Sequence, residues 1–135
     1  MNAERWLKLI LRLTGAALIL GFLFVFVPRS WHAAIHEWCG FGAYPAPPVI
    51  DYLARTASAI YGLSGVFCWL VSFDLVRHKP VIAFLAEASI LFGILCTVVD
   101  HVLGMPWWWR LGEGPPAVGL GIVMLMLLGR VRPRF

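Results

Sequence analysis

The sequence predicts an all-α protein: a four-span transmembrane helical bundle with a short interfacial helix between spans one and two. Hydrophobic residues make up 61% of the 135 residues and charged residues only 13%, a balance too apolar for a water-soluble domain. Four apolar segments approach the roughly 20 residues that a helix needs to cross about 30 Å of hydrocarbon. The 7 Trp and 9 Phe suit a protein whose aromatic side chains mark the boundary between hydrocarbon and water.

The first predicted span covers about residues 6–27. Lys8 and Arg12 lie in its first turns, where long cationic side chains can extend to the headgroups. The segment is too long for a cleaved signal peptide and lacks a convincing small-residue cleavage site. We therefore expect it to stay in the protein as a membrane helix.

A short helix is predicted between the first two spans. Ser30 is its expected N-cap, and the helix should run to about Trp38, where Gly40 and Gly42 end it before a proline-rich stretch. With tryptophans at Trp31 and Trp38, this helix is expected to lie in the outer interface rather than to cross the membrane.

The second and third spans are predicted over about residues 54–73 and 81–100, and Glu87 is the one charge within the apolar run of the third. The fourth, about residues 112–129, contains an apolar run shorter than the criterion. It can cross only if its helix begins near the tryptophan run or the bilayer thins locally. No repeat or linker divides the chain, so residues 1–135 are expected to form a single domain.

The distribution of Lys and Arg predicts that both termini are cytoplasmic. Four spans place the two termini on the same side, and eight of the 11 basic residues then lie on that side. The eight are Arg5, Lys8, Arg12, Arg77, Lys79, Arg130, Arg132 and Arg134, and the other three are Arg29, Arg55 and Arg110. The segment from Phe73 to Pro80 becomes the inner hairpin, with Pro80 at the start of the third helix.

Several function classes lack their minimum residues. The three cysteines form no CxxC pair, which argues against a thiol–disulfide enzyme and a cysteine zinc site. Whether Cys39 and Cys96 pair is left open. No basic patch with interleaved aromatics indicates nucleic-acid binding. Haem is disfavoured because axial histidines would need to face each other inside the bundle, so no cofactor is predicted beyond the metal alternative.

A metal site is an alternative at the outer face. His32 and His36 are four residues apart, a spacing that puts both imidazoles on one face of a helix. His101, Glu37 or Asp51 could supply the third ligand of an outward-facing, metal-dependent membrane enzyme. The competing interpretation is that these histidines face water and headgroups, because the motif lacks the HExxH order.

Glu87 is a second candidate because a carboxylate at membrane depth is costly unless it is protonated or paired. At helical spacing it shares a partly polar stripe with Ile94, Thr97 and His101. The functional interpretation is a proton-coupled small transporter or an acid–base group. The alternative is a neutral Glu87 hydrogen-bonded to another span.

A third pattern follows one line of the second span. Its members are Asp51, Arg55, Ser58, Gly62, Gly65 and Trp69. Ser58 and Gly62 form a small-xxx-small pair that allows close helix packing, and Asp51 with Arg55 is expected to form an ion pair. If Glu87 faces this seam, Arg55 and His101 converge on one outward-opening cavity.

The three consecutive tryptophans lie between the third and fourth apolar runs. Trp107, Trp108 and Trp109 are predicted to form an aromatic belt, on a non-helical path enforced by Gly104 and Pro106. The alternative is a stacking lid over a hydrophobic or cationic ligand.

The layout can be compared with known families through four residues: Arg12, Pro28, Arg55 and Gly62. It resembles the small four-helix bacterial membrane proteins of the broad DoxX-like and related domain-of-unknown-function group. That resemblance implies a multi-pass protein of the bacterial cytoplasmic membrane and transfers no catalytic residue. Small multidrug transporters also have four short helices, but their membrane carboxylate lies in the first helix, unlike Glu87.

The leading functional expectation is a non-catalytic membrane protein that binds a small apolar or amphipathic ligand or a partner membrane subunit, with a homo-oligomer as one form of partner. The lipid bilayer is its surrounding solvent. The candidate ligand-binding or proton-binding residues are Glu87, Arg55, His101, Asp51, Trp69, Trp107, Trp108 and Trp109.

Overall fold

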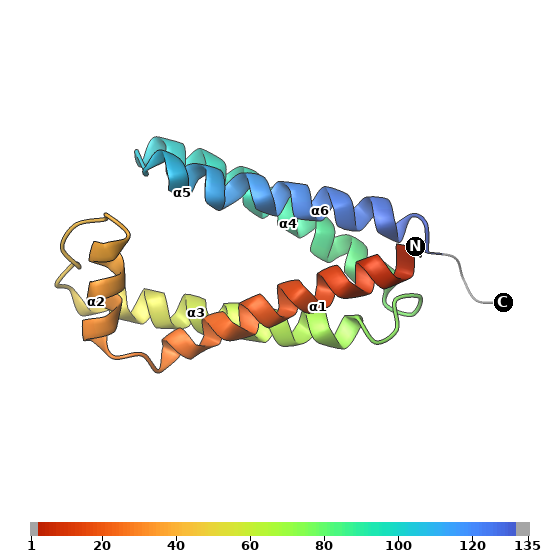
Figure 1. Cartoon of the computed structure of the whole chain (residues 1–135), viewed down its shortest axis with the longest axis horizontal. Helices are drawn as coiled ribbons and strands as arrows, with labels where there is room; N and C mark the ends of the chain where they lie inside the picture. The colour runs from red at the N-terminus through yellow and green to blue at the C-terminus, as the bar shows by residue number, and fades with distance from the viewer. Residues whose placement is uncertain (1–2, 132–135) are drawn as a thin grey trace. The chain divides into compact units, whose positions relative to one another are not determined.

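The computed structural model describes residues 3–131, which form helices and connecting turns without a strand. The all-α prediction is therefore confirmed. Arg132 and Arg134, two of the basic residues used to predict the orientation, lie outside the described residues. The elements are α1 (Ala3–Gly21), the 3-10 helix η1 (Phe22–Val25), α2 (Arg29–Trp38), α3 (Pro48–Val71), α4 (Lys79–Val102), α5 (Trp107–Gly112) and α6 (Gly114–Leu128) (Figure 1).

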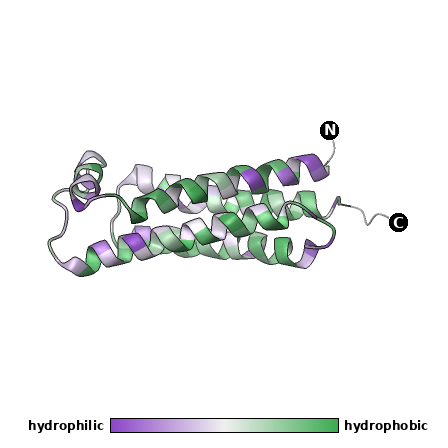
Figure 2. Cartoon of the chain, turned by 90° about the horizontal axis from the view of Figure 1, so that it is seen from below, coloured by the Kyte–Doolittle hydropathy of each residue, from purple (hydrophilic) through white to green (hydrophobic). Residues whose placement is uncertain are grey.

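Three helical segments are long and apolar enough to cross a membrane. They are Ala3–Val25, Lys79–Val102 and Trp107–Leu128. Three of the four predicted spans meet this criterion, and the second does not. The second predicted span lies in α3, which is long enough with 24 residues, but its polar residues lower its mean hydropathy. In Figure 2, α1 begins with a few hydrophilic residues, which are followed by a long hydrophobic stretch.

The fourth predicted span was expected to cross if its helix began near the tryptophan run, and the structure meets this condition. The apolar helix begins at Trp107 and extends over 22 residues, because α5 continues into α6. Trp107–Trp109 are thus helical, which corrects the expected non-helical path. The backbone is irregular before Trp107, where Gly104 has φ +66° and Pro106 precedes the helix with an extended ψ of 146°, and again at Glu113 between α5 and α6.

The predicted short helix is present as α2, with one correction at its start. It begins at Arg29, and Pro28 rather than Ser30 occupies the N-cap position, with φ −60° and ψ 150°. A proline ring fixes φ near this value, so Pro28 sets the direction in which the helix starts. Gly40 and Gly42 both have φ +81°, a conformation that glycine adopts without strain, and the expected end of the helix is confirmed.

The contacts divide the chain into two compact units. The α1–α3 unit is Arg12–Leu70, and the α4–α6 unit is Met1–Leu11 with Val71–Phe135. Each unit is described by itself below. The expectation of a single domain stays a prediction.

The α1–α3 unit is built on close contact between two antiparallel helices. A Cβ added at Gly65 would lie 2.6 Å from the carbonyl oxygen of Gly15, and one at Gly62 would lie 2.6 Å from Phe22. Only glycine allows backbones to approach this closely. The packing role predicted for Gly62 and Gly65 is confirmed, whereas the Ser58 hydroxyl bonds to the carbonyl of Ala54 in its own helix.

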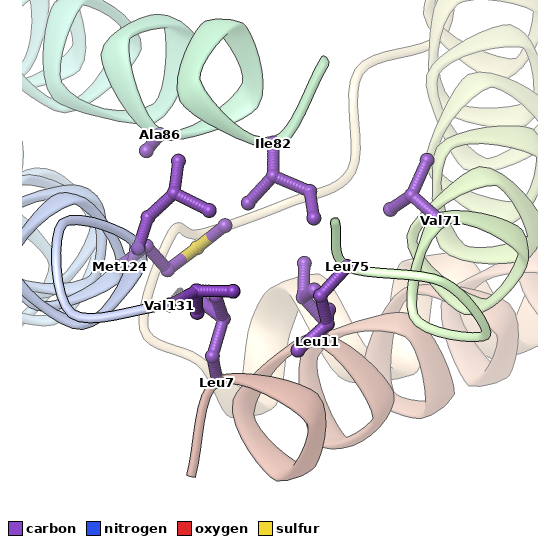
Figure 3. Packing of buried hydrophobic residues seen from close by; sticks show 9 residues of the cluster. Leu7, Leu11, Val71, Leu75, Ile82, Ala86, Met124 and Val131 are labelled. Atoms are coloured by element: carbon purple, nitrogen blue, oxygen red, sulfur yellow. The ribbon is translucent and has the colours of Figure 1, made fainter. Parts of the chain in front are cut away.

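The α4–α6 unit repeats this design with different glycines. A Cβ at Gly93 would lie 2.5 Å from the carbonyl oxygen of Gly114, and Gly121 packs against Ala86. The helices lie side by side in Figure 1, with α5 at one end. Toward the other end the unit has its apolar core, whose side chains point toward one another in Figure 3. The buried members are Leu7, Leu11, Val71, Leu75, Ile82, Ala86, Met124, Leu128 and Val131.

Candidate functional site

An open groove lies where the last turns of α4 meet α5 and the start of α6. We call it the outer groove, because the predicted orientation puts this end of the unit outside. Its volume is about 540 Å³. The lining residues are Thr97, Val98, His101, Val102, Trp107, Arg110, Leu111 and Pro115.

The outer groove has one polar edge. Nη1 of Arg110 lies 3.2 Å from Nδ1 of His101. A guanidinium can only donate, so Nδ1 of His101 accepts and its proton is carried on Nε2. The pair fixes the direction of both side chains at the rim. The Arg110 guanidinium keeps further N–H groups that can meet an anion.

The rest of the outer groove is apolar and accessible. Val98, Val102 and Leu111 are 55%, 76% and 62% exposed, and Trp107 is 69% exposed. Such a continuous exposed apolar lining marks a surface for lipid or another apolar partner. Of the predicted candidate residues, the structure brings together His101 and Trp107 here.

Glu87 is separate from this groove. Its side chain is exposed on α4, whereas the neighbouring Ala86 is fully buried against α6. Thr97 and His101 line the groove, but Glu87 and Ile94 do not. The stripe predicted through Glu87 therefore divides into a groove portion at its outer end and an exposed carboxylate about four turns away.

Arg55 holds the end of the first predicted span. Its guanidinium donates to the backbone carbonyls of Val25 and, at 2.9 Å, of Val27. Val25 is the last residue of η1 and Val27 follows it, so these carbonyls lie where the helix ends and lacks its own donors. The predicted Asp51–Arg55 ion pair is wrong: Asp51 pairs with Arg29 instead. Because Arg55 and His101 belong to different units, their convergence with Glu87 stays a prediction.

The Asp51 carboxylate is the centre of a polar cluster in the α1–α3 unit. It accepts hydrogen bonds from Arg29 and, at 3.0 Å, from the Tyr44 hydroxyl. Burial raises the pKa of Asp51, but the hydrogen bonds from Tyr44 and Arg29 and the charge of Arg29 outweigh it, so the pKa lies below its ordinary value. Burial and the bond to Asp51 raise the pKa of Tyr44. Arg29 also donates to the carbonyls of Pro45 and Ala46, which attaches the proline-rich stretch to α2.

Trp69, proposed from the sequence as a ligand-binding residue, has a packing role. Its Nε1 donates to the carbonyl oxygen of Arg12 at 3.0 Å, and its ring covers Gly15. The Arg12 guanidinium lies 5.5 Å from the centre of the Trp69 ring, within cation–π range. Trp69 therefore joins α3 to α1 within their unit.

The two histidines of α2 contact backbone carbonyl groups and not the other candidate metal ligands. Nε2 of His32 lies 3.1 Å from the carbonyl of Phe24, and Nδ1 of His36 lies 3.0 Å from that of Gly42. Over residues 3–131, no group of three His, Cys, Asp or Glu side chains could hold a metal ion. The contacts instead give His32 and His36 a role in fastening the turns on either side of α2.

Trp108 and Trp109 lie on a different side of α5 from the outer groove. With Gly112 and Glu113 they line a separate hollow of about 400 Å³. Nε1 of Trp109 donates to Oε2 of Glu113 at 2.7 Å, across the junction between α5 and α6. This bond bridges the break in the helix and gives Trp109 a structural role beside its predicted belt role.

Asp100 is a notable residue that the sequence analysis did not single out. It is 6% exposed, and its Oδ2 has no hydrogen-bond partner among the described residues. The signal was a seven-residue spacing: Ala86, Gly93 and Asp100 follow one face of α4, and the first two contact α6. Of the two α4 carboxylates, Glu87, which the sequence analysis expected to need a partner, is exposed, and Asp100 is buried.

The three cysteines, Cys39, Cys68 and Cys96, are free thiols. The structure thus presents a groove with a cationic rim. Comparison of the chain with protein-family models, with curated proteins and with solved structures finds no match.

Proposed function

We propose that this protein is a multi-pass membrane protein that binds an amphipathic anion, with an acyl chain in the outer groove and a carboxylate or phosphate at its rim. The observation that carries the proposal is the composition of the groove. Apolar side chains line it from Val98 to Leu111, and one cationic group, Arg110, lies at its edge. An apolar chain with an anionic head complements both parts.

The rim geometry supports an anion rather than a neutral head. His101 occupies one N–H of Arg110 and holds the guanidinium in place. A planar guanidinium can then offer two parallel N–H groups to a carboxylate or phosphate. The exposed Trp107 indole in the groove lining is suited to the headgroup level of a membrane.

The proposal includes α3 as a fourth membrane crossing. Its polar side chains, which lower its hydropathy, have partners within their own unit: Arg55 bonds two carbonyls, and Thr56 and Ser58 bond carbonyls of α3 itself. Polar groups satisfied in this way cost less in lipid than their hydropathy values suggest. Four crossings place both termini on the same side, and the basic residues favour the cytoplasmic side of a bacterial inner membrane for this protein.

Photocrosslinking with a photoreactive palmitate tests the ligand site. In purified protein, we expect crosslinks on α4 and α5 at the groove residues, and we expect Arg110→Gln to reduce the yield about tenfold because the charge-assisted contact is lost. Arg130→Gln, which removes an exposed arginine elsewhere in the α4–α6 unit, is the control and should leave the yield unchanged. Crosslinks spread evenly over all exposed helix faces, or equal yields in Arg110→Gln and the unchanged protein, would overturn the proposal.

A further inference from the structure

A second cavity lies in the α4–α6 unit, away from the outer groove. It is open on one side, has a volume of about 740 Å³ and is lined by the first turns of α1 and the turn that leads into α4. We call it the basic pocket. Its lining residues are Glu4, Arg5, Lys8, Ser72, Phe73, Asp74, Leu75, Val76 and Arg77.

The backbone around the basic pocket is fixed by its own contacts. Oδ1 of Asp74 accepts the backbone N–H of Arg77 at 3.0 Å, and the Asp74 carbonyl accepts that of His78 at 3.1 Å. Leu75 belongs to the apolar core with Leu7 and Leu11, and these side chains lie together in Figure 3. One wall of the basic pocket is thus continuous with the buried core, and this packing fixes the position of that wall.

The charges in the basic pocket favour an anion. Arg5, Lys8 and Arg77 contribute three cations to the lining, and none of these side chains has a hydrogen bond or an ion pair within residues 3–131. Two carboxylates, Glu4 and Asp74, also line the pocket, so the cations exceed them by one. Oδ1 of Asp74 is engaged in the turn. Cations gathered in one pocket repel one another, and an anion placed among them removes that repulsion.

The surroundings favour a phospholipid as the source of that anion. The pocket contains residues from the inner hairpin and the first turns of α1, which the distribution of basic residues places at the cytoplasmic headgroups. Trp6 and Leu9, on the same helix as Arg5 and Lys8, are 41% and 43% exposed. They lie on α1 outside the pocket lining, where they present an exposed apolar surface to acyl chains. Basic pockets at this level of a membrane protein bind anionic lipid headgroups.

We infer that the basic pocket is a binding site for the phosphate of an anionic phospholipid. Arg77 and Arg5 contact the phosphate oxygens through guanidinium N–H groups, and Lys8 adds a point charge. The acyl chains follow α1 past Trp6 and Leu9. This site shares no residue with the outer groove, so either one can fail without the other.

Native mass spectrometry of the purified, delipidated full chain tests the inference with phosphatidylglycerol and phosphatidylcholine as probes. We expect phosphatidylglycerol to bind about tenfold more tightly. Arg77→Gln should weaken its binding about fivefold, and a triple Arg5→Gln, Lys8→Gln, Arg77→Gln variant should abolish the preference. The matched control is Arg130→Gln, which removes an exposed arginine outside the pocket from the same unit and the same predicted membrane side.

Two further arms keep the test decisive. Arg77→Lys retains the charge and should keep most of the preference, so a loss in Arg77→Gln is attributable to charge rather than to misfolding. Inorganic phosphate at millimolar concentration should not displace phosphatidylglycerol. An equal loss in Arg130→Gln, or equal binding of the two lipids by the unchanged protein, would overturn the site. Full displacement by inorganic phosphate would overturn the lipid as its ligand.

Discussion

The α1–α3 pair and the α4–α6 pair meet the same packing requirement and differ in how their ends are held. In each pair, glycine on one helix meets the backbone of the other: Gly65 against Gly15, and Gly93 against Gly114. Around α1 and α3, the end beside η1 is fixed by polar bonds from Arg55. Around α4 and α6, the end that contains Ile82 and Leu128 is fixed by an apolar core. In both pairs, close backbone contact joins the helices. Hydrogen bonds position the end of one pair, and apolar packing positions the end of the other.

The largest expected effect comes from filling a glycine contact. Gly93→Val would place side-chain atoms against the Gly114 carbonyl, and Gly65→Val against that of Gly15. Each should lower the free energy of unfolding by about 3 kcal/mol, because backbone atoms cannot move aside as a side chain does. Denaturant titration followed by circular dichroism measures both.

Gly119→Val is the matched control, since a Cβ at Gly119 meets no heavy atom within 4 Å. It should be close to neutral, because valine fits a helix no worse than glycine does. If Gly93→Val is as stable as Gly119→Val, the glycine contact is not what joins α4 to α6. Similar losses at Gly65 and Gly93 would establish that both pairs depend on it equally.

An intermediate effect is expected from Arg55→Gln, which affects only the α1–α3 pair. The carbonyls of Val25 and Val27 lose their charged donor, at a cost of about 2 kcal/mol in unfolding free energy. Hydrogen exchange should also accelerate around the end of η1. The control is Arg77→Gln, which removes an arginine without such bonds. Equal stability of the two variants would contradict the end-holding role of Arg55.

The smallest effect is a pH dependence centred on Asp51. Because the folded-state pKa of Asp51 is lowered, its carboxylate contributes stability above the unfolded-state pKa, and this contribution is lost as the pH falls through the lowered folded value. Below about pH 4 the Tm should therefore fall less steeply in Asp51→Asn than in the unchanged protein. Glu37→Gln, in the exposed part of α2, should keep the original slope. Parallel Tm curves for all three proteins would refute the assignment.

The helices were predictable because their signals are local. Long apolar runs identify α1, α4 and α6, and Gly62 and Gly65 on one face of α3 predict a packing seam without knowledge of its partner. Pro28 could also have been recognised as the start of α2, since its fixed φ favours such a position. The helices and their ends can thus be predicted from residues that are close together in the sequence.

The partners of polar side chains could not be predicted in the same way. Spacing along α3 favoured Asp51 with Arg55, but Asp51 reaches back 22 residues to Arg29, and Arg55 binds carbonyls 28 and 30 residues away. Such pairings depend on how a turn folds back. Likewise, the exposure of Glu87 and the burial of Asp100 depend on which face of α4 meets α6, which the Ala86 and Gly93 spacing indicated only weakly.

The most direct test of the account is the membrane topology of α3. In a protein with Cys39, Cys68 and Cys96 replaced by serine, single cysteines at Ala43 and Phe73 report on the two sides of this helix. In intact spheroplasts treated with a membrane-impermeant maleimide, Ala43→Cys should be labelled at once and Phe73→Cys only after the membrane is opened. Labelling of both positions from the same side would contradict a four-span protein and the opposite placement of its two sites.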